Sequence, residues 1–166
     1  MPIRGAFLQP STVAKTLVCI DSIEPAGFSG RFYNLYLPDC VQFRGAFDLV
    51  DRMDRMFDQL GFPHAAFRYR SFYKSRPERF SRPESAEAAC FQDESVFTRE
   101  KGAKMTVIVQ VTTRRNATWQ GTAFWVEQSC RVDFQSACDL IPLIFRSVSS
   151  MGGRIDLLEW EENARE

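Results

Sequence analysis

The sequence predicts an α+β fold made of a tandem βββα repeat, whose two units form a pseudo-twofold pair with antiparallel strands and two packed helices. Two observations lead to this prediction. A shift of 91 residues aligns residues 17–61 with residues 108–152 without a gap. Within each copy the hydrophobic period changes from about two residues, typical of strands, to about 3.6 residues, typical of a helix. Neither copy is long enough to bury a sufficient core alone, so we expect both to share one continuous sheet or a small barrel-like pair of sheets.

Identical residues occur at matched positions throughout the two copies. The matched pairs are Val18/Val109, Ala26/Ala117, Gly30/Gly121, Val41/Val132, Phe43/Phe134, Ala46/Ala137, Asp48/Asp139, Leu49/Leu140, Arg55/Arg146 and Gly61/Gly152. We expect the two valines of the first pair in equivalent central strands. Phe43 and Phe134 are expected to end the third strand of their copy and to point into the core. Ala46 and Ala137 are expected to face the sheet, where a small side chain lets the helix approach closely.

The first copy is predicted to contain strands at 17–20, 30–37 and 40–43, followed by a helix at 44–60. An apolar stripe at three- and four-residue steps predicts the helix, and its members are Phe47, Val50, Met53, Phe57 and Leu60. Gly61 is a typical residue at the end of a helix, with Pro63 just beyond it. The pattern therefore predicts three short strands and then one amphipathic helix.

The second copy is predicted to contain strands at 104–113, 122–127 and 131–134, followed by a helix at about 135–151. Pro142 falls inside this helix, where a proline removes one backbone hydrogen bond and bends or ends the helix. Either the helix begins near Leu140, or it begins near Ser136 with a local irregularity. We favour the start near Ser136, because the apolar periodicity continues through the proline.

These elements divide the chain into five parts. They are an N-terminal arm at 1–15, the first unit at 16–61, a connector at 62–103, the second unit at 104–153, and a C-terminal segment with an acidic tail at 154–166. Pro77 and Pro83 argue against a long helix in the connector. A short final strand is expected at 154–160.

The composition indicates a cytoplasmic protein without a membrane span. The chain has 166 residues with 21 basic and 21 acidic side chains, and 45% of its residues are hydrophobic. The N-terminus lacks the apolar stretch of a signal peptide, and no run approaches the roughly 20 apolar residues of a membrane helix. Five irregularly spaced cysteines without a CxxC pair are interpreted as reduced thiols, with a disulfide frame or zinc site as the less favoured alternative.

No arrangement of residues in the sequence predicts catalysis, a cofactor or a metal. His64 is the only histidine, so it is interpreted as an ordinary loop residue rather than as part of a zinc site or a catalytic triad. The glycine-rich loops that hold phosphates are missing. Asp48 and Asp139 could meet as paired carboxylates, but each falls in the first turns of a helix, where a carboxylate complements the helix dipole. We favour that structural role and predict a non-enzymatic protein.

A basic and aromatic segment at 67–82 is the main candidate for binding. Its candidate residues are Arg68, Tyr69, Arg70, Tyr73, Lys74, Arg76 and Arg79. Arginines interleaved with aromatic rings occur in single-stranded nucleic-acid grooves and in protein interfaces. A third interpretation is a structural connector whose arginines pair with the acidic residues that follow. The neutral net charge favours the connector, with a protein interface second and nucleic acid third.

Trp119 is a further candidate, in the motif Trp119-Gln120-Gly121. An exposed tryptophan at a turn between strands is a typical binding hot spot. A tryptophan close to a glycine with an unusual backbone angle is equally typical of a packed hairpin corner. The matching segment in the first copy, Phe28-Ser29-Gly30, lacks the tryptophan, which favours packing.

The stretch from Asn116 to Gly121, then Trp125, then Phe134 to Leu140 resembles a motif of uncharacterised short proteins common in anaerobic Firmicutes. That motif is N-x-TWQG, then W, then F-x-SA-x-[ED]L. The resemblance implies a bacterial, intracellular protein, and it carries no activity or site residues.

The sequence therefore predicts a non-enzymatic binding or regulatory module that engages another protein. The alternative is a nucleic-acid-binding protein that uses the segment 67–82. Neither a cofactor nor a membrane is expected as a partner, and the oligomeric state is left open.

Overall fold

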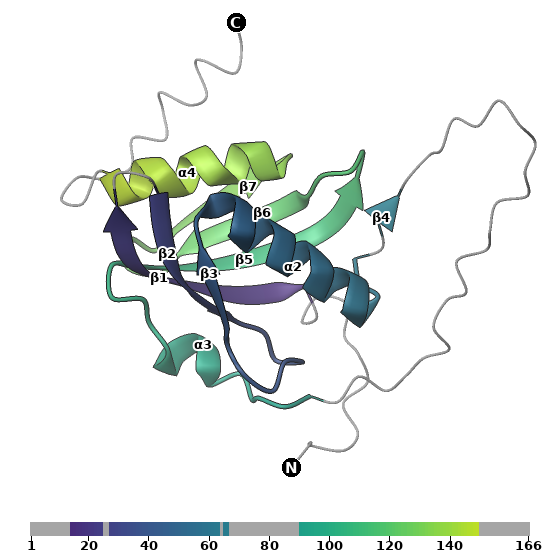
Figure 1. The fold of residues 1–166 in the computed structure, drawn as a ribbon, viewed down its shortest axis with the longest axis horizontal. Coiled ribbons are helices and arrows are strands. Elements are labelled where there is room, and N and C mark those ends of the chain that lie inside the picture. Colours follow the sequence, from purple (N-terminus) through teal and green to yellow (C-terminus); the bar gives the residue numbers. More distant parts are fainter. Residues whose placement is uncertain (1–13, 25–26, 64, 67–89, 150–166) are drawn as a thin grey trace, which may run out of the picture.

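The computed structural model describes residues 14–24, 27–63, 65–66 and 90–149, and the fold is drawn in Figure 1. Its strands are β1 (Lys15–Glu24), β2 (Gly27–Tyr33), β3 (Val41–Arg44), β4 (Ala65–Ala66), β5 (Met105–Arg115), β6 (Gln120–Trp125) and β7 (Cys130–Phe134). Its helices are α2 (Ala46–Leu60), α3 (Val96–Arg99) and α4 (Ala137–Ser149). The predicted α+β class is confirmed, with one antiparallel sheet and two main helices.

The sheet is continuous, and its strands follow the order β3-β2-β1-β5-β6-β7. All neighbours on this path are antiparallel, and β4 adds a short parallel pairing to the end of β5. The first strand of each half thus lies in the centre of the sheet, while β3 and β7 lie at its two ends. Of the two sheet arrangements expected from the sequence, the structure has the single sheet.

Strand register is the same in the two halves once 91 is added to each residue number. In β1 and β2, Ile20 pairs with Gly30, and the register shifts before Ser22 pairs with Ser29. In β5 and β6, Val111 pairs with Gly121, and the register shifts before Thr113 pairs with Gln120. The third strands follow the same rule, because Gly30 pairs with Phe43 and Gly121 with Phe134.

Gly30 and Gly121 lie where neighbouring strands approach too closely for a side chain. A Cβ atom on Gly30 would lie 1.9 Å from the carbonyl oxygen of Cys19, and one on Gly121 would lie 2.0 Å from that of Gln110. A positive φ angle occurs at other described glycines but not at Gly121. The expectation of an unusual backbone angle at Gly121 is therefore wrong, and close approach is the reason for a glycine here.

Both main helices cover the same face of the sheet, as Figure 1 shows. Val18 and Val109, which point to this face from the two central strands, are fully buried as predicted. Phe43 and Phe134 are 2% and 1% exposed, so both point into the core as expected. Alternation along β1 and β5 explains this core, because every second side chain faces the helices.

The apolar stripe of α2 agrees with the predicted one at Met53 and Phe57, whereas Val50 and Leu60 are only partly buried and Phe47 is exposed. The buried residues of α2 are Ala46, Leu49, Met53, Met56 and Phe57. Phe47 points away from the sheet and is 86% exposed. Because Ala46 and Phe47 are both apolar, the sequence pattern fits two helix rotations, and the structure buries the smaller residue against the sheet.

The opposite face of the sheet carries a smaller core around Leu17 and Cys19 of β1. Val96 and Phe97 of α3 cover these residues. This helix was not predicted from the sequence, since four residues are too few to show a helical period of hydrophobic residues. Arg31 holds the chain after α3 in place, because it pairs with Asp21 and donates to the carbonyl oxygen of Lys101.

Most element boundaries lie within a few residues of the prediction, but the first two strands differ more. β1 (Lys15–Glu24) extends beyond the predicted 17–20 at both ends, and β2 runs from Gly27 to Tyr33 rather than over 30–37. Asn34 is fully buried and ends the strand with its side chain. Its Oδ1 accepts from the backbone N–H of Tyr36 at 2.9 Å, and its Nδ2 donates to the carbonyl oxygen of Lys15 at 3.2 Å. This local turn competes with strand pairing. Gly61 ends α2 with φ of 66°, as predicted.

α4 runs from Ala137 through Pro142, which supports the predicted start near Ser136 over a start near Leu140. The expected strand at 154–160, the C-terminal tail and residues 1–13 of the N-terminal arm lie outside the described residues, while Lys15 at the end of that arm begins β1. No helix in the described part of the chain is long and apolar enough to cross a membrane.

Candidate protein interface

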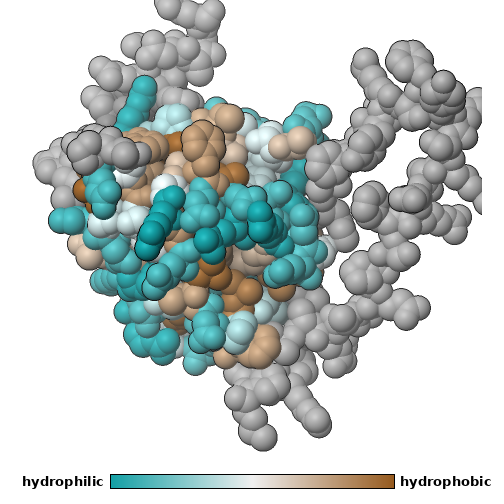
Figure 2. Space-filling view, viewed as in Figure 1, coloured by the Kyte–Doolittle hydropathy of each residue, from teal (hydrophilic) through white to brown (hydrophobic). Residues whose placement is uncertain are grey.

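The outer face of α2 carries the most exposed large hydrophobic residue in the described ranges. Phe47 is 86% exposed, while the next, Phe91, is 45% exposed. Figure 2 shows hydrophilic residues in a band over α2 with hydrophobic residues on both sides of it. Exposure of a whole phenylalanine ring to water costs free energy that contact with a partner would recover.

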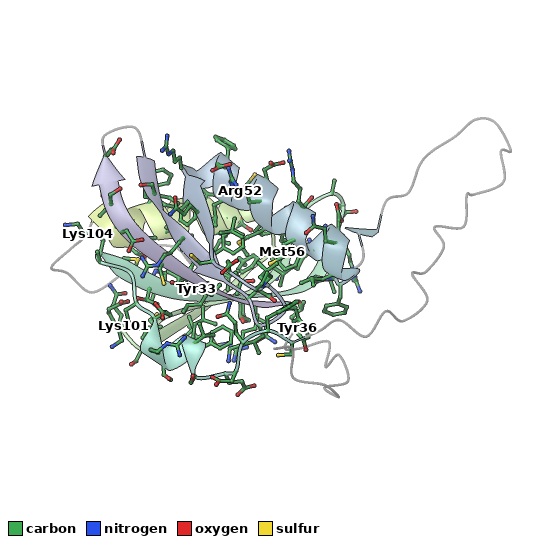
Figure 3. The ribbon with its side chains drawn as sticks, turned by 60° about the horizontal axis from the view of Figure 1, so that its bottom comes forward. Tyr33, Tyr36, Arg52, Met56, Lys101 and Lys104 are labelled. Carbon is green, nitrogen blue, oxygen red and sulfur yellow. The ribbon has the colours of Figure 1, made fainter. Side chains whose placement is uncertain are left out.

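A groove of about 400 Å³ lies between α2 and the chain that leads into β3. Leu37 and Val41 line one side, and Met56 of α2 contributes from the other. Figure 3 labels Arg52 and Met56 along α2, one turn apart. The groove thus joins an apolar floor to the charged outer surface of the helix.

Two ion pairs border this groove along α2. Arg52 Nε donates to Asp48 Oδ1 at 2.8 Å, and Arg55 Nη2 lies 3.0 Å from Asp51 Oδ2. Asp48 Oδ2 also accepts from the backbone N–H of Arg44 at 2.8 Å. That backbone hydrogen bond, followed by the hydrogen bond from Arg52, lowers the pKa of Asp48 below its ordinary value. Both oxygens of Asp48 are therefore occupied.

The corresponding carboxylate, Asp139, has the same local role at the start of α4. Its Oδ2 accepts from the backbone N–H of Gln135 at 3.2 Å. Asp48 and Asp139 thus each bond to the backbone of the segment before their helix. Each also lies in the first turn of its helix, where a carboxylate complements the helix dipole, as the sequence predicted.

Among the residues that the structure describes, β3 is an end strand with backbone groups that have no partner. The N–H of Arg44 bonds to Asp48, while the N–H of Gly45 bonds to Phe28 of β2. Because backbone groups alternate in direction along an antiparallel strand, Gln42 directs its N–H and C=O away from β2, as Arg44 does. The groove therefore borders a strand edge that can accept another strand.

The other half does not repeat this groove. The residues that correspond to Asp51, Arg52 and Met56 are Pro142, Leu143 and Ser147. Leu143 and Ser147 are buried in that half, and a proline replaces the paired carboxylate. The strand edge and the bond from the helix carboxylate to the preceding backbone occur twice, whereas the Asp51, Arg52 and Met56 side chains that line the groove have no equivalents in α4.

The two halves also differ at the start of their main helices. In the first half, a hollow of about 470 Å³ is lined by residues that include Gly27, Ser29 and Gly45. In the second half, the side chains of Thr118 and Gln120 stand at the positions that match Gly27 and Ser29. Thr118 Oγ1 accepts from the backbone N–H of Ala137 at 3.0 Å, which caps α4.

Trp119 is buried, with 2% of its surface exposed. Its indole N–H donates to Asp54 Oδ1 at 3.0 Å, and its ring meets Phe57 edge to face with 5.6 Å between centroids. The idea of an exposed hot spot at Trp119 is therefore corrected. The side chain packs the turn before β6 against α2.

Arg114 completes this cluster as a buried cation. Its Nη1 donates to Asp54 Oδ1 at 2.9 Å, its Nη2 to Asp58 Oδ1 at 2.7 Å, and its Nε to the carbonyl oxygen of Pro63 at 2.7 Å. The side chain of Arg114 is only 5% exposed. These contacts fasten α2 of the first half to β5 of the second. Arg114 was not predicted from the sequence. The only feature of the sequence that could have indicated it is its position close to the repeated motif.

The basic candidate residues between Arg68 and Arg79 lie outside the described residues. Among the described residues, no group of three His, Cys, Asp or Glu side chains is arranged to hold a metal ion. Comparison of the chain with protein-family models, with curated proteins and with solved structures finds no match.

Proposed function

We propose that this chain is a non-enzymatic binding or regulatory module that engages another protein through α2 and the adjoining groove. Phe47 carries this proposal, because it is 86% exposed and directly precedes Asp48, one of the residues that line the groove. Aromatic residues and arginines are enriched in the centres of protein interfaces, and both types occur here. The expected cytoplasmic location is retained in the proposal.

We also infer that the two halves arose by tandem duplication and form a pseudo-twofold pair. The identical register of the two halves supports this inference. Contacts between the halves support it as well. The ring centroids of Phe28 and Phe145 lie 5.0 Å apart, and the residues at the corresponding positions, Trp119 and Asp54, are joined by a hydrogen bond. In a duplicated scaffold, features present in one half alone are the natural candidates for a binding role, and the groove is such a feature.

Site-specific photo-crosslinking tests the proposal. A photoreactive benzoyl-phenylalanine at position 47 should give a discrete adduct with another protein in a lysate of the cells that make this chain. The matched control carries the same group at position 138, because Cys138 corresponds to Phe47 and is also exposed. An adduct from position 47 alone supports the proposal. Equal labelling from both positions, no adduct, or only an adduct of two copies of the chain would contradict it.

A further inference from the structure

We infer that the groove beside α2 binds an extended peptide segment that joins β3 as an added strand and carries an acidic side chain. This inference rests on the proposed function and names the kind of partner segment involved. Its basis is the combination of one open strand edge, an apolar floor and unfilled positive hydrogen-bond donors.

The strand edge defines the shape of the partner segment. Gln42 directs its N–H and C=O outward, whereas the outward N–H of Arg44 is already bonded to Asp48. A peptide that pairs with β3 must therefore be extended, and the pairing is short because only one outward residue of β3 has both groups free. Edge pairing of this kind supplies affinity through the backbone and selectivity through alternate side chains.

The groove defines one side chain of that segment. In an added strand, every second side chain points to the face of the sheet that carries α2. There it meets Leu37, Val41 and Met56, which form the apolar part of the groove. An apolar residue at this position buries its side chain against them.

The charges along α2 define the next side chain on the same face. Both oxygens of Asp48 are occupied by Arg44 and Arg52. Arg52 uses its Nε for that pair, and within the described residues its Nη1 and Nη2 have no partner. Asp51 pairs with Arg55 through its Oδ2. We assign the acidic side chain of the segment to Arg52, because two donors on one guanidinium complement a carboxylate. The expected segment has an apolar residue and an Asp or Glu two positions apart.

A library of random peptides displayed on phage, selected on the immobilised full chain, tests the inference. Enriched peptides should contain the apolar and acidic pair. One enriched peptide, synthesised with a fluorescent label, is then titrated against variants of the chain by fluorescence anisotropy. Gln42→Pro removes the outward N–H and should weaken binding at least about fivefold, which reflects one backbone hydrogen bond and the blocked strand edge. Arg52→Glu should weaken it by a similar or larger factor.

Two matched controls separate the inference from a loss of folding. Asp133→Pro makes the corresponding change on β7, where Gln135 and Asp139 repeat the bond between Arg44 and Asp48. It should leave binding unchanged. Replacing the acidic residue of the peptide by lysine should restore binding to Arg52→Glu. Circular dichroism and thermal melting verify that each variant is folded.

The outcomes distinguish this inference from the proposed function. Binding that is insensitive to Gln42→Pro and Arg52→Glu would overturn the inference, although a peptide would still be bound. A library that yields no specific peptide would also overturn it. In either case the proposed function is decided separately by the crosslinks from position 47.

Discussion

Leu17 of β1 lies directly opposite Ile108 of β5. These two residues occupy matching positions in the two halves, because they are 91 residues apart in the sequence. The N–H of Val111 donates to the carbonyl oxygen of Ala14 in the same ladder. Counting from this bond, Leu17 and Ile108 form a non-hydrogen-bonded pair, the kind in which opposite Cα atoms are closest. The pairing puts the first strand of each half in the centre of the sheet and so leaves β3 and β7 as its ends.

Truncation of the two core phenylalanines should be costly in both halves. Phe43→Ala and Phe134→Ala should each lower the free energy of unfolding by about 3–5 kcal/mol, because each removes a buried ring and leaves a cavity. Chemical denaturation measures both values. Phe47→Ala is the control and should change stability by less than about 0.5 kcal/mol, since its ring is exposed. A large loss in the control would mean that Phe47 belongs to the core.

Substitution of the two close-approach glycines should also destabilise both halves. An alanine Cβ at Gly30 or Gly121 would overlap a carbonyl oxygen of the neighbouring strand, which forces the backbones apart. We expect a loss of about 1–3 kcal/mol or more for Gly30→Ala and for Gly121→Ala. Thr122→Ala, on the same strand as Gly121, should cost less than about 1 kcal/mol. Thermal melts that match wild type for both glycine variants would refute the close packing.

The cluster around Arg114 should depend more on Asp54 than on Asp58. Asp54 accepts hydrogen bonds from Arg114 and from Trp119, whereas Asp58 accepts from Arg114 and is largely exposed. Asp54→Ala should lower the free energy of unfolding by about 2–3 kcal/mol, because buried charged and indole donors lose their acceptor. Asp58→Ala should cost about 1 kcal/mol or less. Urea titrations rank the two, and the reverse order would contradict the proposed geometry.

The hydrogen bonds of Asp48 to Arg44 and Arg52 should make stability depend on pH. The folded-state pKa of Asp48 lies below the ordinary value of 3.8, so these bonds contribute stability above that value, and the contribution is lost as pH falls through the lower folded-state pKa. Asp48→Ala should therefore be less stable than wild type at neutral pH, and the difference should shrink in acid. Denaturation curves over this range measure it. A difference that stays constant down to strongly acidic pH would argue against an ionised Asp48 in these bonds.

Local sequence patterns were sufficient to predict the order of strands and helix within each half and the burial of Phe43 and Phe134. The two predictions for the start of α2 conflicted, because the matched alanines placed Ala46 against the sheet while the apolar stripe included the adjacent Phe47. The structure confirms the prediction for Ala46. The end of β2 was missed because it depends on Asn34, whose buried side chain bonds to β1 and to its own turn. Such long-range contacts leave no period in the sequence.

The groove was missed for a related reason. It forms where residues near Val41 approach α2, and its unfilled donors appear only once the partners of Asp48 and Arg52 are known. The sequence analysis instead favoured the basic segment at 67–82, which lies outside the described residues. A run of charged and aromatic residues in a sequence shows which side chains are available for binding. It does not show which of them remain without partners after folding, and a binding surface depends on that.

The pairing of β1 with β5 is the central claim, because it makes β3 an end strand and leaves the groove open. Nuclear Overhauser spectroscopy of the full chain in solution measures it directly. We predict a strong cross-peak between the α-protons of Leu17 and Ile108, because these residues form a non-hydrogen-bonded pair whose α-carbons lie close together. The absence of this cross-peak, together with cross-peaks that pair β1 or β3 with β7, would contradict the account and remove the open edge from the proposal.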